Sequence, residues 1–470
     1  MRWGQKAERN AAGPVRSQAR DEVTGLLAFA PFLHACGDAL AAYVDATTEA
    51  EPALLLVDLE GIHSAVDLGA HVVTDEVVAV MAGRIAREVG SIGLLARTTD
   101  SQVGVLFGHL PTPAVALDLA YRIVAAVTSP AALPDGRRVQ LSATCGLVTR
   151  AVVGPRASAT DLIHGAGLAV RDARRSGRNR IEVCTEEMVA LADETVTIGK
   201  DLRKALAENG LNVCYQPLVD LASGQALGFE ALVRWTHPVH GAVSPARFVP
   251  VAEQFGLISE LGAMVLSTAT AQIAQWSATF GVPLAAHVNV SGMDLAQEDF
   301  VSTVEESLGV SGLPPQQLVL EVTESTVEPD VDVARRRFEA LRERGVRIAL
   351  DDFGTGRSAL SYLQSLPLDI LKVDRSFLDG ATAAETARAE DLLRGVIALG
   401  QTLGITVYGE GIEDEEQRAR LRASGIEIGQ GYLFARPLPP EDAVALLKVQ
   451  STPVDSLSRR LLAAEGASHA

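Results

Sequence analysis

Short apolar runs alternate with longer amphipathic stretches along the second half of the chain. The runs at 285–288, 318–320 and 348–350 each end in a polar or acidic residue. Between such runs, apolar residues recur at helical spacing, as in 259–276 and 331–344. Buried strands that alternate with amphipathic helices are typical of a parallel barrel or a doubly wound sheet. The pattern therefore predicts an α/β domain of about 250 residues, the usual size of a β/α barrel.

The first half follows a different order. A buried run at 54–60 precedes an amphipathic stretch at 72–89, and two strand-like segments at 93–97 and 103–107 are close enough to form a β-hairpin. A helix at 113–127, a strand at 139–148 and a helix at 159–173 follow in the pattern. This order predicts a smaller α+β domain with a mainly antiparallel sheet and helices on one face.

These patterns divide the chain into five segments. They are a basic mobile tail at 1–20, the smaller domain at 21–186, an acidic and polar linker at 187–198, the barrel at 199–448 and a C-terminal tail at 449–470. The first segment lacks the apolar centre of a signal peptide. No apolar run approaches the about 18–20 residues that cross a membrane, so we expect no membrane partner.

Charge and cysteine usage narrow the function further. The chain has a formal net charge of −18 and four scattered cysteines without a C-x-x-C pair. A strongly acidic chain disfavours nucleic acid and anionic membranes as partners, although an anionic ligand can still bind through metal ions. Unpaired thiols are typical of a reducing compartment, and we expect the protein to be cytoplasmic.

Polar residues end the predicted strands of the second half. They are Glu230, Asn289, Glu321, Asp351 with Asp352, Lys372 with Asp374, Glu410 with Glu413, and Gln430. In a β/α barrel the carboxyl ends of the strands meet at one face, where catalytic groups collect. The sequence therefore predicts one acidic cluster that contains a lysine. The alternative for a lone Asp351 or Asp352 is that it only caps the next helix.

Several carboxylates in one pocket require cations. Two carboxylates about 4 Å apart repel by roughly 4 kcal/mol at an effective dielectric near 20. Oxygen ligands from Asp, Glu and Asn, without thiolate or imidazole, favour Mg²⁺ or Mn²⁺. Two such ions about 3.5–4 Å apart can stabilise the attacking and leaving oxygens of a phosphodiester. The residues alone therefore predict a two-metal phosphoryl-transfer site.

Eight ordered motifs lie between residues 215 and 432. They are Tyr215-Gln216-Pro217, Glu230-Ala231-Leu232-Val233-Arg234, Val288-Asn289-Val290-Ser291, Glu321-Val322-Thr323-Glu324, Asp351-Asp352-Phe353-Gly354, Leu371-Lys372-Val373-Asp374, Glu410-Gly411-Ile412-Glu413 and Gln430-Gly431-Tyr432. On these motifs the second half resembles the EAL-type cyclic di-GMP phosphodiesterases. The resemblance implies a TIM-type (β/α)8 barrel with one irregular strand, hydrolysis of cyclic di-GMP to linear pGpG, and a homodimer formed through this domain.

The resemblance also implies roles for individual residues. The metal ligands that it implies are Glu230, Asn289, Glu321, Asp351, Asp352 and Glu410. Asp351 would bridge two ions, Mg²⁺ or Mn²⁺. Lys372, with Asp374 nearby, would position the attacking water, and Glu410 would act as general base.

Other motif residues would bind substrate or support the pocket. The substrate-binding residues that the resemblance implies are Gln216, Arg234 and Gln430. Arg234 suits this role because its planar fork matches a phosphate, although a barrel-rim ion pair is the alternative. Glu324 would anchor the loop at 352–358 and Glu413 would support the pocket, unless both are only acids at helix N-termini. Arg357, where the family usually has Tyr, and Gly409, where it has Ala, remove no ligand.

Four weaker motifs lie in the first half. They are Asp21-Glu22-Val23-Thr24-Gly25-Leu26, Val57-Asp58-Leu59-Glu60-Gly61, Asp67-Leu68-Gly69 and Ser176-Gly177-Arg178-Asn179-Arg180. On these the first half resembles a GGDEF (diguanylate cyclase) domain. The signature hairpin, however, reads Thr99-Asp100-Ser101-Gln102-Val103, so both glycines and the acidic pair are missing.

Further family positions are also replaced in this half. Ala28 and Val66 stand at the guanine-reading positions, and Gly90 and Gly93 at the inhibitory site. We therefore predict a degenerate domain that makes no cyclic dinucleotide and serves as a regulatory or dimerisation module. For the whole chain, the alternatives to a phosphodiesterase are a cyclic di-GMP receptor that does not hydrolyse its ligand and a scaffold that acts through partner contacts.

Overall fold

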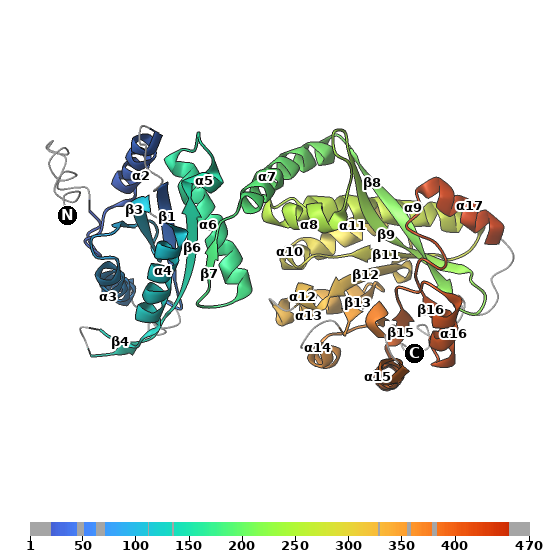
Figure 1. The fold of residues 1–470 in the computed structure, drawn as a ribbon. Helices are drawn as coiled ribbons and strands as arrows, with labels where there is room; N and C mark the ends of the chain where they lie inside the picture. The colour runs from blue at the N-terminus through green and yellow to red at the C-terminus, as the bar shows by residue number, and fades with distance from the viewer. Residues whose placement is uncertain are drawn as a thin grey trace. The chain divides into compact units, whose positions relative to one another are not determined.

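The computed structural model divides the chain into two compact units, Met1–Val196 and Thr197–Ala470 (Figure 1). It describes residues 20–44, 51–62, 71–110, 112–133, 136–327, 330–354, 359–377 and 383–450. The predicted tails at 1–20 and 449–470 lie almost wholly outside these ranges, as do Val66, Asp67-Leu68-Gly69 and Arg357. The two units are described separately.

The N-terminal unit is built on a five-stranded sheet in the order β2-β3-β1-β6-β7. Its strands are β1 (Glu51–Glu60), β2 (Leu94–Arg97), β3 (Gln102–Leu110), β6 (Ser142–Thr149) and β7 (Ile181–Val183), with a separate ribbon of β4 (Ala131–Ala132) and β5 (Arg138–Val139). All pairs in the main sheet are antiparallel except β6 with β7. The mainly antiparallel sheet and the β2–β3 hairpin confirm the prediction.

Helices cover both faces of this sheet, so the prediction of helices on one face was wrong. The helices are α2 (Phe29–Val44), α3 (His71–Val89), α4 (Pro113–Thr128), α5 (Arg150–Val153) and α6 (Ala159–Ser176). Helices α3 and α4 pack on the face that includes Leu55, whereas α2 and α6 pack on the face that includes Leu54. Strand β1 is buried along almost its whole length because it is covered on both sides.

A 22-residue helix, α7 (Glu186–Ala207), crosses the division between the units at Val196 and Thr197. Residues 187–198, which we expected to form a linker, are therefore helical. The acidic residues Glu186 and Glu187 lie in the first turn of α7, where they interact favourably with the helix dipole.

The C-terminal unit is a closed eight-stranded barrel. Its strands are β8 (Leu211–Asp220), β9 (Ala226–His237), β11 (Ala285–Asn289), β12 (Leu318–Thr323), β13 (Arg347–Phe353), β14 (Ile370–Val373), β15 (Thr406–Gly409) and β16 (Ile428–Gly429), with β10 (Gly241–Val243) paired to β9. Strand β8 closes the barrel by pairing antiparallel with both β9 and β16, and the other barrel pairs are parallel. The TIM-type barrel with one irregular strand is confirmed.

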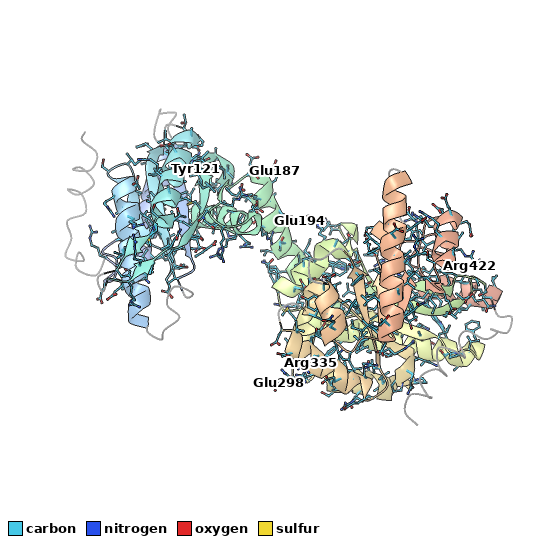
Figure 2. The ribbon with its side chains drawn as sticks, turned by 90° about the horizontal axis from the view of Figure 1, so that it is seen from below. Tyr121, Glu187, Glu194, Glu298, Arg335 and Arg422 are labelled. Carbon is cyan, nitrogen blue, oxygen red and sulfur yellow. The ribbon has the colours of Figure 1, made fainter. Side chains whose placement is uncertain are left out.

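Amphipathic helices surround the barrel and include the two that the sequence predicts at 259–276 and 331–344. They are α8 (Pro245–Gln254), α9 (Ile258–Phe280), α10 (Gly292–Ala296), α11 (Phe300–Ser311), α12 (Glu324–Val327), α13 (Val331–Arg342), α14 (Ala359–Ser365), α15 (Ala383–Leu403), α16 (Glu415–Ala423) and α17 (Pro440–Gln450), with short turns η2 (Pro315–Gln317) and η3 (Arg375–Phe377). Polar faces such as those of Arg335 on α13 and Arg422 on α16 lie outside (Figure 2).

Two apolar layers hold the barrel together. The larger packs the outer faces of the strands against the helices and includes Phe229, Leu320 and Phe338. The smaller fills the barrel interior with residues such as Val319 and Tyr408. Because inward-facing side chains alternate along each strand, Glu321 lies one layer above Val319, toward the carboxyl ends.

Candidate active site

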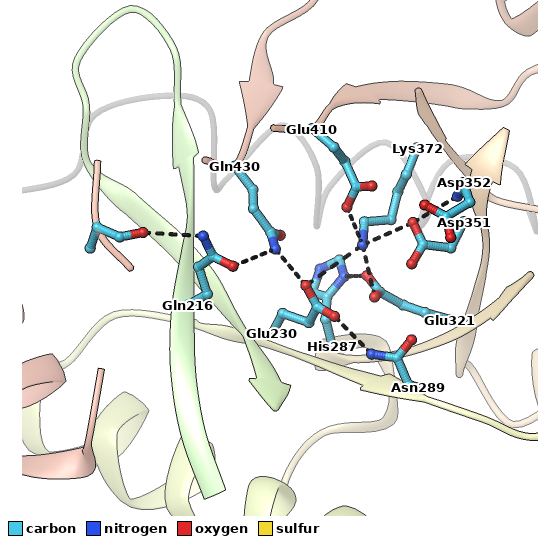
Figure 3. Close-up of polar contacts among 11 residues, drawn as sticks. Gln216, Glu230, His287, Asn289, Glu321, Asp351, Asp352, Lys372, Glu410 and Gln430 are labelled. Carbon is cyan, nitrogen blue, oxygen red and sulfur yellow. Dashed lines mark hydrogen bonds and ion pairs between the residues drawn. The ribbon is translucent and has the colours of Figure 1, made fainter. Parts of the chain in front are cut away.

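The carboxyl ends of the parallel strands bring the predicted acids together around one lysine (Figure 3). Lys372 on β14 is 1% exposed, and its Nζ lies 2.8 Å from Glu321 Oε2, 3.3 Å from Asp351 Oδ1 and 2.5 Å from Glu410 Oε1. Glu230 Oε2 is 3.9 Å away. One ammonium can neutralise only one of four carboxylates, so the cluster keeps excess negative charge.

Asp351 and Asp352 face the same site because the backbone departs from a regular strand between them. The register between β13 and β14 shifts between Leu350 and Phe353, and Asp352 has a φ of 53°. The backbone N–H of Asp352 donates to Asp351 Oδ1 at 3.0 Å. A left-handed φ is uncommon for a residue other than glycine and is often found at functional sites. The irregularity overcomes the alternation that would otherwise separate adjacent side chains.

Ligand atoms of Asp351, Asp352 and Glu410 all lie within 4.8 Å of one another. Asp351 is buried, Glu410 is partly exposed and Asp352 is exposed. Asn289, at the end of β11, is also exposed and donates from Nδ2 to Glu230 Oε1 at 2.7 Å. These oxygen-rich groups fit a hard divalent ion, since the donors are carboxylates and an amide.

A glutamine pair extends the cluster toward strand β8. Gln430, which follows β16, donates from Nε2 to Glu230 Oε2 at 2.5 Å and to Gln216 Oε1 at 3.2 Å. Gln216 on β8 in turn donates to the Ala435 carbonyl at 3.1 Å. The pairing of β8 with β9 places Gln216 opposite Glu230. Gln430 therefore holds Glu230 directly, and Gln216 acts on Glu230 through Gln430.

His287 belongs to the same network, although the sequence analysis did not select it. Its Nδ1 lies 2.7 Å from Glu321 Oε1, and its side chain is almost fully buried. Burial, with Lys372 and Arg347 nearby, lowers the pKa of His287 well below its usual value, so the ring is neutral at pH 7. The hydrogen bond between His287 and Glu321 fixes the orientation of the imidazole ring. The available signal was the two-residue spacing to Asn289, which puts both on one face of β11.

The family models match both halves of the chain. The model of the EAL domain matches residues 200–437, and that of the GGDEF diguanylate cyclase domain matches residues 18–180. The chain belongs to the EAL family. Its EAL domain is the barrel described above, and a GGDEF domain precedes it, which confirms the tandem arrangement.

Curated relatives span both domains. An uncharacterized signaling protein of Caulobacter vibrioides is 38% identical over 388 residues, which cover 82% of this chain and 47% of that protein. The bifunctional diguanylate cyclase/cyclic di-GMP phosphodiesterase MucR of Pseudomonas aeruginosa is 35% identical over 396 residues, covering 84% and 56%. The cyclic di-GMP phosphodiesterase NbdA of the same organism is 34% identical over 387 residues, covering 82% and 49%. The chain thus spans about half the length of the curated relatives that it matches.

A solved structure of the EAL enzyme Bd1971, bound to cAMP and cyclic di-GMP, has the same architecture. It is 26% identical, with a TM-score of 0.52, over 66% of this chain and 82% of that one. In the part of the chain that the structure describes, no helix combines the length and the apolar character needed to cross a bilayer.

Asp374 and Arg234 are the remaining residues that the sequence predicts for catalysis and substrate binding. Asp374 follows β14, accepts a hydrogen bond from the Ser376 N–H at 2.8 Å and contributes to the raised pKa of Asp352. Arg234, on β9, is partly exposed and donates to the Val233 carbonyl at 2.8 Å. These contacts leave both side chains outside the ion-pair network of Lys372.

Glu324 and Glu413 differ in their surroundings. Glu324 begins α12, and its buried Oε1 has no hydrogen-bond partner among the described residues. The loop that it is predicted to anchor, 352–358, lies outside those residues from 355 onward. Glu413 is exposed and pairs with Arg375 at 2.5 Å.

Burial and mutual repulsion raise the pKa of three carboxyl groups in the EAL site, those of Asp352, Glu321 and Glu410. Burial raises the pKa of Glu410 to about 8. The positive charge of Lys372 opposes this shift, whereas the negative charges of Asp351 and Glu230 add to it. Burial likewise raises the pKa of Glu321 well above its usual value, although Lys372 opposes the shift. The cluster therefore holds protons near pH 7 when no other cation is bound.

We expect Mn²⁺ affinity to rise between pH 6 and pH 8. A protonated Glu410 would not bind a cation beside Asp351 and Asp352, so affinity should increase by about tenfold per pH unit below a pKa of about 8. The metal-free protein should lose stability as pH rises from about 4.3 toward 8, since the folded state binds more protons than the unfolded state in this window. Isothermal titration calorimetry at both pH values measures the affinity and the protons released. Equal affinities would contradict the expected coupling.

Proposed function

We propose that the EAL barrel hydrolyses cyclic di-GMP to linear pGpG with the help of two divalent ions, Mg²⁺ or Mn²⁺. The observation that carries the proposal is the group of four carboxylates within 4 Å of the buried Lys372 ammonium. Relatives named as cyclic di-GMP phosphodiesterases cover most of the chain, which supports the choice of substrate.

The residues of the cluster suit two ions that share one ligand. We assign Glu230, Asn289 and Glu321 to the first ion, Asp352 and Glu410 to the second, and Asp351 to both. Ligand atoms of Asp351, Asp352 and Glu410 lie close together, which supports the assignment of these three residues to the second ion. Bound divalent ions would supply Lewis-acid activation of the phosphodiester and of the attacking water.

The side chains would then position and deprotonate the water. In this proposal Lys372 donates a hydrogen bond to the water, with Asp374 nearby to orient it, and Glu410 accepts the proton as general base. The water oxygen bonds to phosphorus, the P–O3′ bond breaks, and the released 3′ oxygen takes up a proton. The product is linear pGpG.

Residues around the cluster would select and hold the substrate. We assign the contacts with cyclic di-GMP to Gln216, Arg234 and Gln430, with Arg234 on a phosphate. Gln430 forms hydrogen bonds with both Glu230 and Gln216, which supports a place for the two glutamines at the edge of the pocket. Glu324 would anchor the loop at 352–358, and Glu413 would support the pocket.

Separation of cyclic from linear dinucleotide tests the proposal. Full-chain protein with Mn²⁺ or Mg²⁺ should convert cyclic di-GMP to pGpG, and a chelator should stop the reaction. Glu230→Ala should leave the substrate intact, because it removes a carboxylate that both Lys372 and Asn289 contact. If the unchanged protein leaves cyclic di-GMP intact while Glu230→Ala binds it equally well, the barrel is a receptor and the proposal is wrong.

We also propose that the GGDEF domain is a regulatory or dimerisation module without cyclase activity. Asp58, the acid that remains, is fully buried and forms an ion pair with Arg174. Ser101, in the altered hairpin, donates to Asp58 at 3.4 Å, where the family has a carboxylate. An arginine in contact with the remaining acid supplies the positive charge that a metal ion would otherwise bring.

GTP with Mg²⁺ should therefore give no cyclic di-GMP. The assay uses Glu230→Ala in the full chain, so that the barrel does not consume any product, and chromatography of the nucleotides. Arg174→Ala in the same background should also be inactive, since it frees Asp58 but restores neither missing carboxylate. Formation of cyclic di-GMP by Glu230→Ala would show that the domain is an active cyclase.

We further propose a homodimer formed through the EAL domain, on the resemblance to the family. Sedimentation velocity of the full chain should give twice the mass of one chain. A single species with the mass of the monomer at tens of micromolar protein would contradict this assembly.

A further inference from the structure

The barrel contains a second polar site at the end opposite the carboxylate cluster. A cavity of about 30 Å³ lies where the parallel strands begin, between the starts of β9, β11 and β13. Its polar lining residues are His287, Gln317, Arg347 and Tyr408, and the others are apolar. Leu227 and Pro283 line it and are partly exposed, which places one side of the cavity near solvent.

Two polar groups in this lining are buried without a partner. Arg347, the first residue of β13, is 8% exposed, and its Nε has no hydrogen-bond partner among the described residues. Gln317, at the end of η2, is also 8% exposed, and its Oε1 likewise has none in that part of the chain. Buried polar groups are nearly always hydrogen-bonded, so each requires a partner that is not a residue of the described chain.

The cavity lining in the described part of the chain also lacks a negative charge that would balance Arg347. No Asp or Glu lies among the described residues that line it, and Arg347 is its one cationic side chain. A guanidinium remains ionised in proteins, so it cannot relieve the imbalance by losing a proton. An isolated buried charge is costly unless it is paired.

We propose that this cavity binds a small planar oxyanion that carries a hydroxyl group, of the bicarbonate class. Arg347 would donate to its charged oxygens, and its hydroxyl would donate to Gln317 Oε1. Water could satisfy the two hydrogen-bonding atoms but would not offset the charge. The planar guanidinium fork matches two oxygens of such an anion. A cavity of about 30 Å³ exceeds the about 10–15 Å³ that one water requires, but it is too small for a nucleotide.

The anion site is distinct from the catalytic cluster and does not depend on the proposed reaction. His287 lies between them, since it lines the cavity and contacts Glu321 through Nδ1. The experiment therefore measures binding of the anion itself, not turnover.

Thermal unfolding of the full chain in sodium bicarbonate, against sodium chloride and sodium formate at the same ionic strength, tests the proposal. Formate has two oxygens for the guanidinium but no hydroxyl for Gln317 Oε1, and chloride offers neither. We expect bicarbonate to raise Tm by about 3 °C relative to chloride in the unchanged protein, and by more than formate does. Arg347→Met keeps the apolar stem but removes the charge, so the difference between the salts should disappear.

Gln317→Glu is the second variant, because it retains Arg347. It places a carboxylate in the cavity lining, which should make an external anion unnecessary and abolish the effect of bicarbonate. If bicarbonate has no effect on the unchanged protein, the cavity holds only water and the proposal is wrong. A full bicarbonate effect in Gln317→Glu, or in a folded Arg347→Met, would overturn it as well, and an equal effect of formate would overturn the role of Gln317.

Discussion

Asp351→Asn is expected to lower turnover of cyclic di-GMP by about a thousandfold, as judged from the usual cost of removing a charged group from a reacting centre. Asp351 is the proposed ligand of both ions, so the loss of its charge should weaken both. The metal-free variant should melt at the same temperature as the unchanged protein or higher, because one of the carboxylates that raise the pKa of Glu321 and Glu410 becomes neutral. Steady-state kinetics and thermal unfolding with and without Mn²⁺ measure both effects.

Glu298→Gln is the matched control, because Glu298 is an exposed carboxylate outside the cluster (Figure 2). It should leave turnover, Mn²⁺ affinity and Tm unchanged. If Asp351→Asn kept at least a tenth of the activity with unaltered Mn²⁺ affinity, the bridging role would be wrong. A large fall in its metal-free Tm would instead show that Asp351 stabilises the fold.

The position of the cluster follows from sequence alone, because one geometrical rule applies to every strand. Parallel strands of a barrel end at one face, so Glu321 and Lys372 could be brought together without knowing any distance. Nζ of Lys372 lies 2.8 Å from Glu321 Oε2. This rule does not bring the adjacent residues Asp351 and Asp352 to one face, because neighbouring side chains of a regular strand point to opposite sides. The two can share a site because the strand is irregular there, with a register shift and a positive φ at Asp352.

Features that depend on tertiary packing were not predictable in this way. The sequence analysis did not predict helix α2, and it placed helices on only one face of the sheet that contains the buried run at 54–60. His287 and Arg347 carry no motif of their own. Their importance arises from which side chains face each other across the barrel interior, and single-sequence periodicity gives only the face of each strand.

Lys372→Met is expected to destabilise the metal-free protein and to abolish most turnover. Breaking a buried ion pair by removing one partner typically costs about 3–5 kcal/mol, and Lys372 lies within 4 Å of four carboxylates. For a domain of this size the loss corresponds to a fall in Tm of about 10 °C. Methionine preserves much of the buried volume, so the fall reports the charge rather than a cavity. Differential scanning calorimetry with a chelator measures it.

Divalent ions separate the structural from the catalytic role of Lys372. Because the variant leaves the carboxylates without a cation, Mn²⁺ should raise its Tm by more than it raises that of the unchanged protein. Turnover should nevertheless stay about a thousandfold low, since no other side chain replaces the ammonium beside the attacking water. Lys204→Met, at an exposed position of α7, is the control and should change neither quantity. If metal-free Lys372→Met had the same Tm as the metal-free unchanged protein, the ammonium would not offset the carboxylate charge.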